Sequence, residues 1–542
     1  MAAFGALAVG PYDPASPREG PAGCPRRNAA VATPRLGHHG AFVRPRFIRY
    51  VLPTAGCAVF LLSVAVPTIA LLARCALDGE RPAGGFTLTG RQWGLLGRSV
   101  GLAALATVTS LVVSIPGAYV VGRLGRLSRR PLLVAILIAP LLFPPMVYVF
   151  GWQKLLPAAF SGGLQCVGVW ALWAYPIPAL LIGSGWSRFG RAIYETALLD
   201  APPASAFARA VLPRLWPHVV LSALVLFILF LGEYGVPHAC GMMIYATELL
   251  GWSMESRFPI DTLWPSWPVA VLILAACAIV RVVWGRCFAE NDTGTADASA
   301  RGASASLTLL AVVCVGVAAI VPTVALAADL ESASVIGTAI RTYHGELLGS
   351  LAVTGSSGAI VVGMGVCVAA VRRLRRPVLL WTIAFGALPG ALVGEAILSA
   401  YQNVPAIYNH WWIIILGFVA RFGWIGVSAM MLALRAAPEE LDWQARTDGA
   451  DEAGVSLHIH AVLSWPTLLF GACLVAALSL SELPTSTLVR VPSLRLIAQT
   501  LMEKFHRFED DMLISLSLCL VMATVPAAVL LAVVLRRVRS LR

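Results

Sequence analysis

Long, nearly uncharged apolar runs are the feature that most constrains how this chain can fold. A helix needs roughly 20 apolar residues to cross the hydrocarbon core of a bilayer. Twelve such spans are expected, at about 50–73, 95–121, 132–151, 165–186, 218–237, 266–284, 307–328, 347–371, 378–400, 411–434, 466–483 and 512–535. Only 13% of the residues are charged, against about 25% in soluble chains. The sequence therefore predicts an all-α polytopic membrane protein with about 12 transmembrane helices, and it excludes a soluble globular protein or a disordered chain.

The excess of positive charge is placed where membrane topology predicts it. The chain has 40 Lys and Arg against 28 Asp and Glu, a net charge of +12. Arginines cluster in loops on one side, at Arg123, Arg126, Arg129, Arg130, Arg372, Arg373, Arg375, Arg376, Arg536, Arg537, Arg539 and Arg542. Acids gather on the other side, at Glu248, Glu255, Asp261, Asp329, Glu331, Glu346, Glu509, Asp510 and Asp511. The positive-inside rule then predicts that both termini are cytoplasmic, and it explains the charge without a nucleic-acid partner.

Composition divides the chain into four parts. Residues 1–48 are rich in Pro, Gly, Ala and Arg and are expected to form a disordered, basic cytoplasmic tail. A first half of six spans covers 49–285, a polar linker of small residues covers 286–306, and a second half of six spans covers 307–542.

The two halves repeat each other in sequence. Three landmarks recur in order: an Arg-Arg-Pro triplet at 129–131 and 375–377, a Trp-Pro pair at 216–217 and 465–466, and a glutamate 16 residues after that proline, Glu233 and Glu482. Because each half has six spans, the two copies run in the same direction. The sequence thus predicts two parallel six-helix repeats.

A long cytoplasmic loop precedes the fifth span of each half. The first, 194–217, reads YETALLDAPPASAFARAVLPRLWP and is broken at Pro202-Pro203. The second, 438–466, reads PEELDWQARTDGADEAGVSLHIHAVLSWP and is broken by a turn at Asp448-Gly449. A short helix between two such breakers can move as a rigid unit, and a glycine permits a tight turn.

These loops resemble the EAA loops of binding-protein-dependent ABC importer permeases, and the chain from about residue 50 to about residue 540 resembles the fused, two-half ferric-iron/thiamine type. The residues at matching positions are Glu195, Ala197, Asp200, Ala201, Pro213 and Pro217 in the first loop, and Ala445, Asp448, Gly449, Ala450 and Pro466 in the second. Ala201 stands where the family has glycine, and Trp443 stands where it has glutamate.

The resemblance implies a non-catalytic permease in the bacterial inner membrane. It implies that the two loops couple to two ABC ATP-binding subunits, and that a periplasmic binding protein delivers the solute. Ferric iron is the expected solute, with thiamine, a polyamine or a phosphonate as alternatives. The residues agree with a separate ATPase, because neither lysine, Lys154 after Gln153 or Lys504 after Glu503, lies in a Gly-Lys-Ser/Thr phosphate loop. No cofactor is expected, and the scattered histidines indicate no metal site.

Three acids within the expected spans are candidates for the translocation pathway: Glu233, Glu482 and Glu395. A carboxylate at the bilayer centre costs about 2.5–3.5 kcal/mol on insertion scales, so a matched pair suggests a shared role. Glu233 and Glu482 could line the path of a cation or close a gate, or they could simply sit solvated at the ends of their spans. Arg421 is a candidate partner for one of the acids.

Two other functions remain open at the level of sequence. A secondary transporter of the major facilitator type also has two parallel six-span halves and a central cytoplasmic linker, but long loops between the fourth and fifth spans are not typical of that family. A membrane scaffold without transport is the second alternative, and the paired intramembrane glutamates argue against it.

Overall fold

The computed structural model describes residues 46–77, 87–123, 130–157, 160, 162–187, 191–256, 258–288, 305–436 and 439–524. These residues belong to one compact unit. Their regular structure is helical throughout, with a single isolated β-bridge between Val491 and Leu494. The predicted all-helical membrane fold is therefore confirmed. Nearly all of the basic tail, most of the 286–306 linker and the arginines beyond residue 524 lie outside the described residues.

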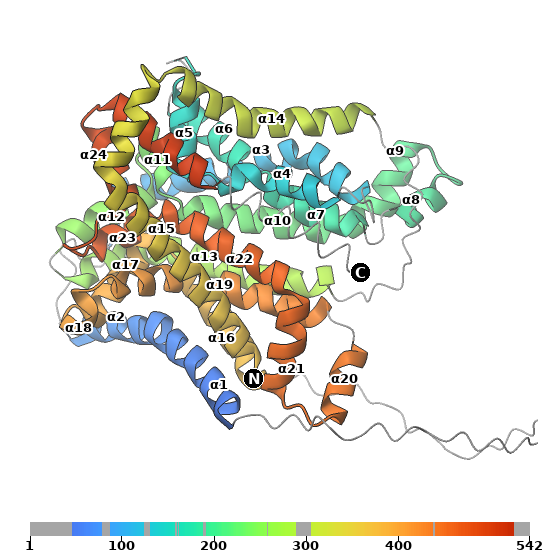
Figure 1. The fold of residues 1–542 in the computed structure, drawn as a ribbon. Coiled ribbons are helices and arrows are strands. Elements are labelled where there is room, and N and C mark those ends of the chain that lie inside the picture. Colours follow the sequence, from blue (N-terminus) through green and yellow to red (C-terminus); the bar gives the residue numbers. More distant parts are fainter. Residues whose placement is uncertain are drawn as a thin grey trace, which may run out of the picture. The chain divides into compact units, whose positions relative to one another are not determined.

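Figure 1 shows the arrangement of the helices. The elements before the linker are α1 (Arg46–Phe60), η1 (Leu61–Ala65), α2 (Val66–Leu77), α3 (Gly90–Arg123), α4 (Arg130–Leu142), α5 (Pro145–Gln153), α6 (Gly163–Ala174), α7 (Pro176–Gly185), α8 (Arg191–Ala197), α9 (Pro203–Ala206), η4 (Phe207–Val211), α10 (Leu212–Gly232), α11 (Gly235–Ala239), α12 (Tyr245–Glu255) and α13 (Pro259–Phe288). The elements after it are α14 (Ala305–Ala328), α15 (Ala333–Ala369), α16 (Arg372–Gly386), α17 (Gly390–Tyr401), α18 (Pro405–Tyr408), α19 (Trp412–Ala436), α20 (Glu439–Thr447), α21 (Glu452–Val455), η5 (Ser456–Ala461), α22 (Trp465–Leu480), α23 (Leu483–Leu488) and α24 (Ile497–His506).

The described residues contain seven uninterrupted candidate spans and four bent helix pairs, or up to 11 spans if each pair counts as one. The uninterrupted spans are Pro53–Leu77, Gly90–Gly122, Pro203–Gly232, Pro259–Gly285, Ser306–Ala328, Ala333–Ala369 and Trp412–Leu434. The remaining expected span, 512–535, is helical over 510–524, and its other residues lie outside the described part of the chain. The count of twelve thus stays a prediction.

Breaks within spans are the main departure from the expected continuous helices. The third span of each half bends sharply, by 95° between α4 and α5 and by 111° between α16 and α17. Proline explains both breaks, because Pro144 and Pro389 have extended backbones (ψ 126° and 141°) immediately before α5 and α17. The fifth span of the first half also ends earlier than expected, at Gly232, because the backbone of Glu233 leaves the helix.

Matched hydrogen bonds occur in corresponding parts of the two halves. The Ser99 hydroxyl on α3 accepts from the first backbone N–H of α12, that of Tyr245, at 2.8 Å. The Ser350 hydroxyl on α15 accepts from the first N–H of α24, that of Ile497, at the same distance. The first N–H groups of a helix have no partner within it, so each serine caps a short helix in the same way.

The first helices of the two halves pack on the opposite half. The helices α1 and α2 contact α15 and α17, whereas α14 contacts α3, α4 and α5. In Figure 1, α14 accordingly runs beside α3 and α5, far from α16. The helical packing therefore interleaves the two sequence halves.

The helices α15 and α19 approach each other most closely at glycines. A Cβ at Gly365 would overlap the carbonyl of Gly426, and a Cβ at Gly426 would overlap the carbonyl of Val361. Without a hydrophobic driving force between helices in lipid, small residues that allow close backbone contact are the usual basis of such packing.

The elements beyond the spans gather at two opposite ends of the helical unit. The short helices α8, α9, α20 and α21 lie at one end, and α12, α18 and α24 lie at the other (Figure 1). At the second end, the Lys154 ammonium bridges Asp329 at 2.8 Å and Asp510 at 3.0 Å. Acids that the sequence places opposite the arginine-rich loops thus contact one of the two lysines.

Candidate functional site

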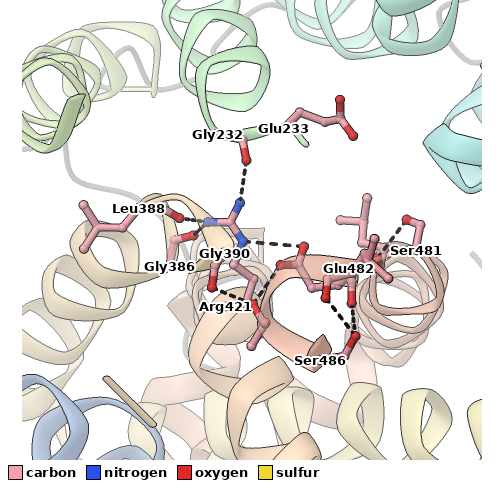
Figure 2. Close-up of polar contacts among 12 residues, drawn as sticks. Gly232, Glu233, Gly386, Leu388, Gly390, Arg421, Ser481, Glu482 and Ser486 are labelled. Carbon is pink, nitrogen blue, oxygen red and sulfur yellow. Dashed lines mark hydrogen bonds and ion pairs between the residues drawn. The ribbon is translucent and has the colours of Figure 1, made fainter. Parts of the chain in front are cut away.

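Glu233 follows α10 and turns its carboxylate onto the start of α11. The carboxylate accepts hydrogen bonds from the backbone N–H of Gly235 at 2.6 Å and of Val236 at 3.1 Å. A third bond comes from the indole N–H of Trp170 on α6, at 2.9 Å. Figure 2 shows the carboxylate pointing away from Arg421. Three donors satisfy Glu233, which explains how an acid is held at this depth.

Glu482 occupies the corresponding place after α22 and before α23. Its Oε1 accepts from the Thr485 hydroxyl at 2.8 Å, and its Oε2 lies 3.8 Å from Nε of Arg421. The side chain also packs against Gly390 at the start of α17, where a Cβ would overlap Oε1. The candidate pairing of Arg421 with an acid is thus observed, and the acid is Glu482.

Arg421 lies on α19 and makes contacts beyond Glu482. Its Nη1 donates to the carbonyl oxygens of Gly386, at 2.7 Å, and of Leu388. Its Nη2 lies 3.4 Å from the carbonyl oxygen of Gly232, at the end of α10 (Figure 2). The guanidinium therefore joins the end of α10, the break between α16 and α17, and the acid after α22.

Glu395 lies apart from this group. It is buried on α17, the helix that packs on α2. Among the described residues its side chain receives no hydrogen bond, and the positive charge of Arg74 on α2 acts on it. The structure therefore brings Glu233 and Glu482 to the contacts around Arg421 and separates Glu395 from them.

The first candidate coupling loop forms a compact helical hairpin. The helix α8 packs against η4, and Trp186, which follows α7, stacks on Phe207 of η4 at 5.6 Å and contacts the ring of Tyr194 of α8 at 6.2 Å. The candidate residues lie on the outer side of this hairpin: Glu195, Asp200 and Pro213 are exposed, and Ala197 and Ala201 are half-buried.

The second candidate coupling loop begins with α20, which ends in a glycine turn. Gly449 has a φ of +84°, the backbone N–H of Ala450 bonds to the carbonyl of Ala445 at 2.8 Å, and that of Gly449 bonds to Arg446 at 3.1 Å. This pair of bonds is a Schellman motif, which glycine favours because it has no Cβ. Asp448 and Gly449 are exposed, as is Trp443, at 71%.

The sequence indicated no metal site among the histidines, and it did not show one structural contact that a histidine makes. His460 on η5 is 3% exposed, and its Nε2 lies 3.0 Å from Oδ1 of Asp442 on α20. The Ser456 hydroxyl of the same turn donates to the carbonyl of Ala369. The only feature of the sequence that could have indicated this contact was the presence of an acid and a histidine within one loop.

Comparison with known proteins gives two curated relatives. Both are described as molybdenum transport system permease protein ModB, from Mycobacterium bovis (strain ATCC BAA-935 / AF2122/97) and Mycobacterium tuberculosis (strain ATCC 25618 / H37Rv). Each is 34% identical over 209 residues, which make up 35% of this chain and 75% of the relative. No family model and no solved structure matches. At this identity and coverage, the chain belongs to the permease family of binding-protein-dependent ABC importers.

Proposed function

We propose that this chain is the membrane subunit of an ABC importer that carries an oxyanion of the molybdate type. The observation that carries the proposal is the similarity to two molybdenum transport permeases over 75% of their length. A periplasmic binding protein would deliver the oxyanion, and two ATP-binding subunits would drive its passage into the cytoplasm. Ferric iron, the solute expected from the sequence, has no support from these comparisons.

The contacts of the two matched glutamates favour a gate over a cation path. Glu233 accepts three hydrogen bonds from its own half, and Glu482 is shared between Thr485 and Arg421. A carboxylate whose oxygens already accept such bonds offers little to a passing cation. Two carboxylates in the path would also repel an anion. We therefore infer that they act on the helices and that other groups contact the solute.

The length of the chain supports two permease units in one polypeptide. The 209 matched residues are three quarters of each relative but only 35% of this chain, so this chain is about twice as long as either relative. The serine caps at Ser99 and Ser350 and the glutamates after α10 and α22 agree with a duplicated unit. We propose the division at 49–285 and 307–542, with the first helix of each half packed on the other.

The two loops at one end of the helical unit are the proposed contacts for the ATP-binding subunits. Both expose large apolar side chains, with Leu199 at 84% and Trp443 at 71%. Charge reversal of Asp200 combined with disruption of Asp448-Gly449 should uncouple ATP hydrolysis from transport. Transport that continues unchanged in this variant would refute the coupling assignment. This placement also makes the arginine-rich side, and with it both termini, cytoplasmic.

Because the chain belongs to the ABC permease family, it is not a secondary transporter of the major facilitator type. The same similarity gives no support to a scaffold without transport. The proposal is tested in two steps. Tagged permease is first purified from its native membrane, where an ATP-binding subunit should co-purify. The complex is then reconstituted in proteoliposomes with the cognate binding protein, and uptake of molybdate, ferric iron and thiamine is compared. ATP-dependent uptake of molybdate alone is the expected result, and uptake of ferric iron or thiamine instead would overturn the oxyanion assignment.

A further inference from the structure

The guanidinium of Arg421 caps the ends of two helices at once. The helix α10 ends at Gly232 and α16 ends at Gly386, with Leu388 in the gap before α17. The last carbonyl groups of a helix have no partner within it and carry partial negative charge. Arg421 donates to carbonyls at both ends, so its buried positive charge is compensated by helix ends as well as by Glu482.

These two helix ends come from different halves of the chain. Gly232 lies 189 residues before Arg421, in the first half, whereas Gly386 and Leu388 lie in the same half as Arg421. The backbones are close, because a Cβ built at Gly232 would lie 3.6 Å from the carbonyl oxygen of Ala387 and 3.9 Å from Cα of Pro389. Arg421 therefore connects the end of α10 to the break in the third span of the other half.

The first half has a different residue beside its matched glutamate. Trp170 on α6 donates to Glu233, whereas Arg421 on α19 faces Glu482. An indole has one N–H and no charge, and that N–H is used within its own half. Of these two residues, only Arg421 therefore contacts both halves.

The distances indicate which contact gives way first. The contact to Gly386 within the second half is 2.7 Å, whereas the contact across the halves to Gly232 is 3.4 Å. Loss of the longer contact would leave Arg421 with the carbonyls of its own half and with Glu482. An unpaired carbonyl at membrane depth is tolerated only where it meets protein or water, so the Gly232 carbonyl can leave Arg421 only if another protein group or water takes its place.

We propose that Arg421 is a positioning residue that latches the closed state, holding the end of α10 against the α16–α17 break, and that opening of the transport path breaks its contact with Gly232. The proposal rests on the proposed transport function, because a latch requires a path to open. It concerns the helices and not the solute, so it can be tested without knowing the cargo.

Disulfide trapping tests the latch directly. Gly232→Cys and Ala387→Cys are introduced together into the full chain, in a background where the 11 native cysteines are serine. A Cβ at position 232 lies 3.5 Å from Nη2 of Arg421, which is an ordinary contact distance, so the substitution does not force the backbone apart. In membranes without ATP, we expect ready crosslinking. Adding Arg421→Met should lower the yield several-fold, and Arg421→Lys should lower it less. Arg341→Met, which removes an exposed arginine on α15, is the control and should leave the yield unchanged.

An undiminished crosslink in the Arg421→Met variant would overturn the proposal, as would an equal loss in Arg341→Met. Arg421→Lys keeps the charge and guards against a variant that fails to fold. The importer reconstituted without binding protein supplies a second measurement: Arg421→Met should raise basal ATP hydrolysis, and an unchanged rate counts against a latch. If crosslinking depends on Arg421 but no solute is taken up by the parent importer, Arg421 still holds the two helix ends together, and it is the transport assignment that fails.

Discussion

Oδ1 of Asp442 on α20 lies 3.0 Å from Nε2 of His460 on η5, an ion pair when the histidine is protonated. The pair joins the candidate coupling helix to the turn that leads into α22. In the first loop, η4 carries no histidine, and Trp186 holds the hairpin through aromatic contacts with Tyr194 and Phe207. The two coupling loops are thus fixed to their spans by different chemistry.

Loss of this ion pair should weaken coupling through the second loop. In an Asp442→Ala variant, we expect ATP hydrolysis stimulated by the binding protein to fall several-fold, because α20 loses its fixed position relative to α22. Gln444→Ala, an exposed substitution on the same helix, is the control, and equal effects of the two substitutions would contradict the assignment.

The turn at Gly449 should require glycine. Gly449→Ala forces a side chain into a backbone with φ +84°, which costs about 1–2 kcal/mol for a residue with a Cβ. We expect lower coupling efficiency with unchanged amounts of permease in the membrane, measured as transport per ATP hydrolysed. Ala201→Gly at the corresponding place in the first loop should have little effect, since Phe508 is the only non-glycine residue of positive φ in the described chain.

The packing of α15 on α19 should depend on Gly365 and not on Gly363. A Cβ at Gly365 overlaps the backbone of Gly426, whereas nothing lies within 4 Å of a Cβ at Gly363. Gly365→Val should therefore destabilise the permease by about 1–3 kcal/mol, the usual cost of overpacking. Thermal unfolding of the purified protein in detergent measures this, and a similar loss from Gly363→Val would show that close approach of the helices is not the cause.

Glu233 should tolerate substitution less well than Glu395. Three donors face the Glu233 carboxylate, so the amide group of Glu233→Gln would oppose one of them, at a cost of about 1–3 kcal/mol. The buried Glu395 receives no hydrogen bond from the described residues, so Glu395→Gln should unfold at the same temperature as the parent or higher. The opposite order of the two unfolding temperatures would refute this reading of the contacts.

The pair of Glu233→Gln and Glu482→Gln also tests the pathway idea. If the carboxylates act through the helices that they contact, the double variant should lose transport while still binding its ATP-binding subunits. Uptake and co-purification are measured on the same preparation. Unaltered uptake would show that neither residue acts in the transport path or in a gate.

Acid should destabilise the permease through His238, which lies beyond the end of α10. Burial, and then the neighbouring His506 at 3.4 Å, lower the pKa of His238 from 6.5 to about 4. The folded state therefore keeps His238 neutral where the unfolded chain binds a proton, and stability falls as the pH drops from 6.5 toward 4. The fall in unfolding temperature between about pH 7 and about pH 5 should be smaller in His238→Gln. An equal fall would show that other groups carry the effect.

The sequence by itself predicted the all-helical membrane fold, the candidate spans and the residues of the two loops. Apolar length and arginine placement are local properties, and they can be read without knowing which helices meet. The register of Glu233 and Glu482 could also be read directly, because two copies of one unit preserve the spacing from their prolines. Prolines 144 and 389 were visible too, but a proline alone does not show whether a span bends or continues.

Tertiary structure alone decided the contacts that these residues make. The packing of α1 and α14 on opposite halves depends on residues far apart in the chain. The bend angles of 95° and 111° and the Asp442–His460 contact arise within single spans or loops, but the sequence did not show them. The clearest case is Arg421. The sequence marks it as a charge within a span that needs compensation, but the compensating carbonyls belong to backbone at Gly232, Gly386 and Leu388, where no side chain signals their role. Backbone carbonyls become available only where helices end, and the fold determines which ends meet.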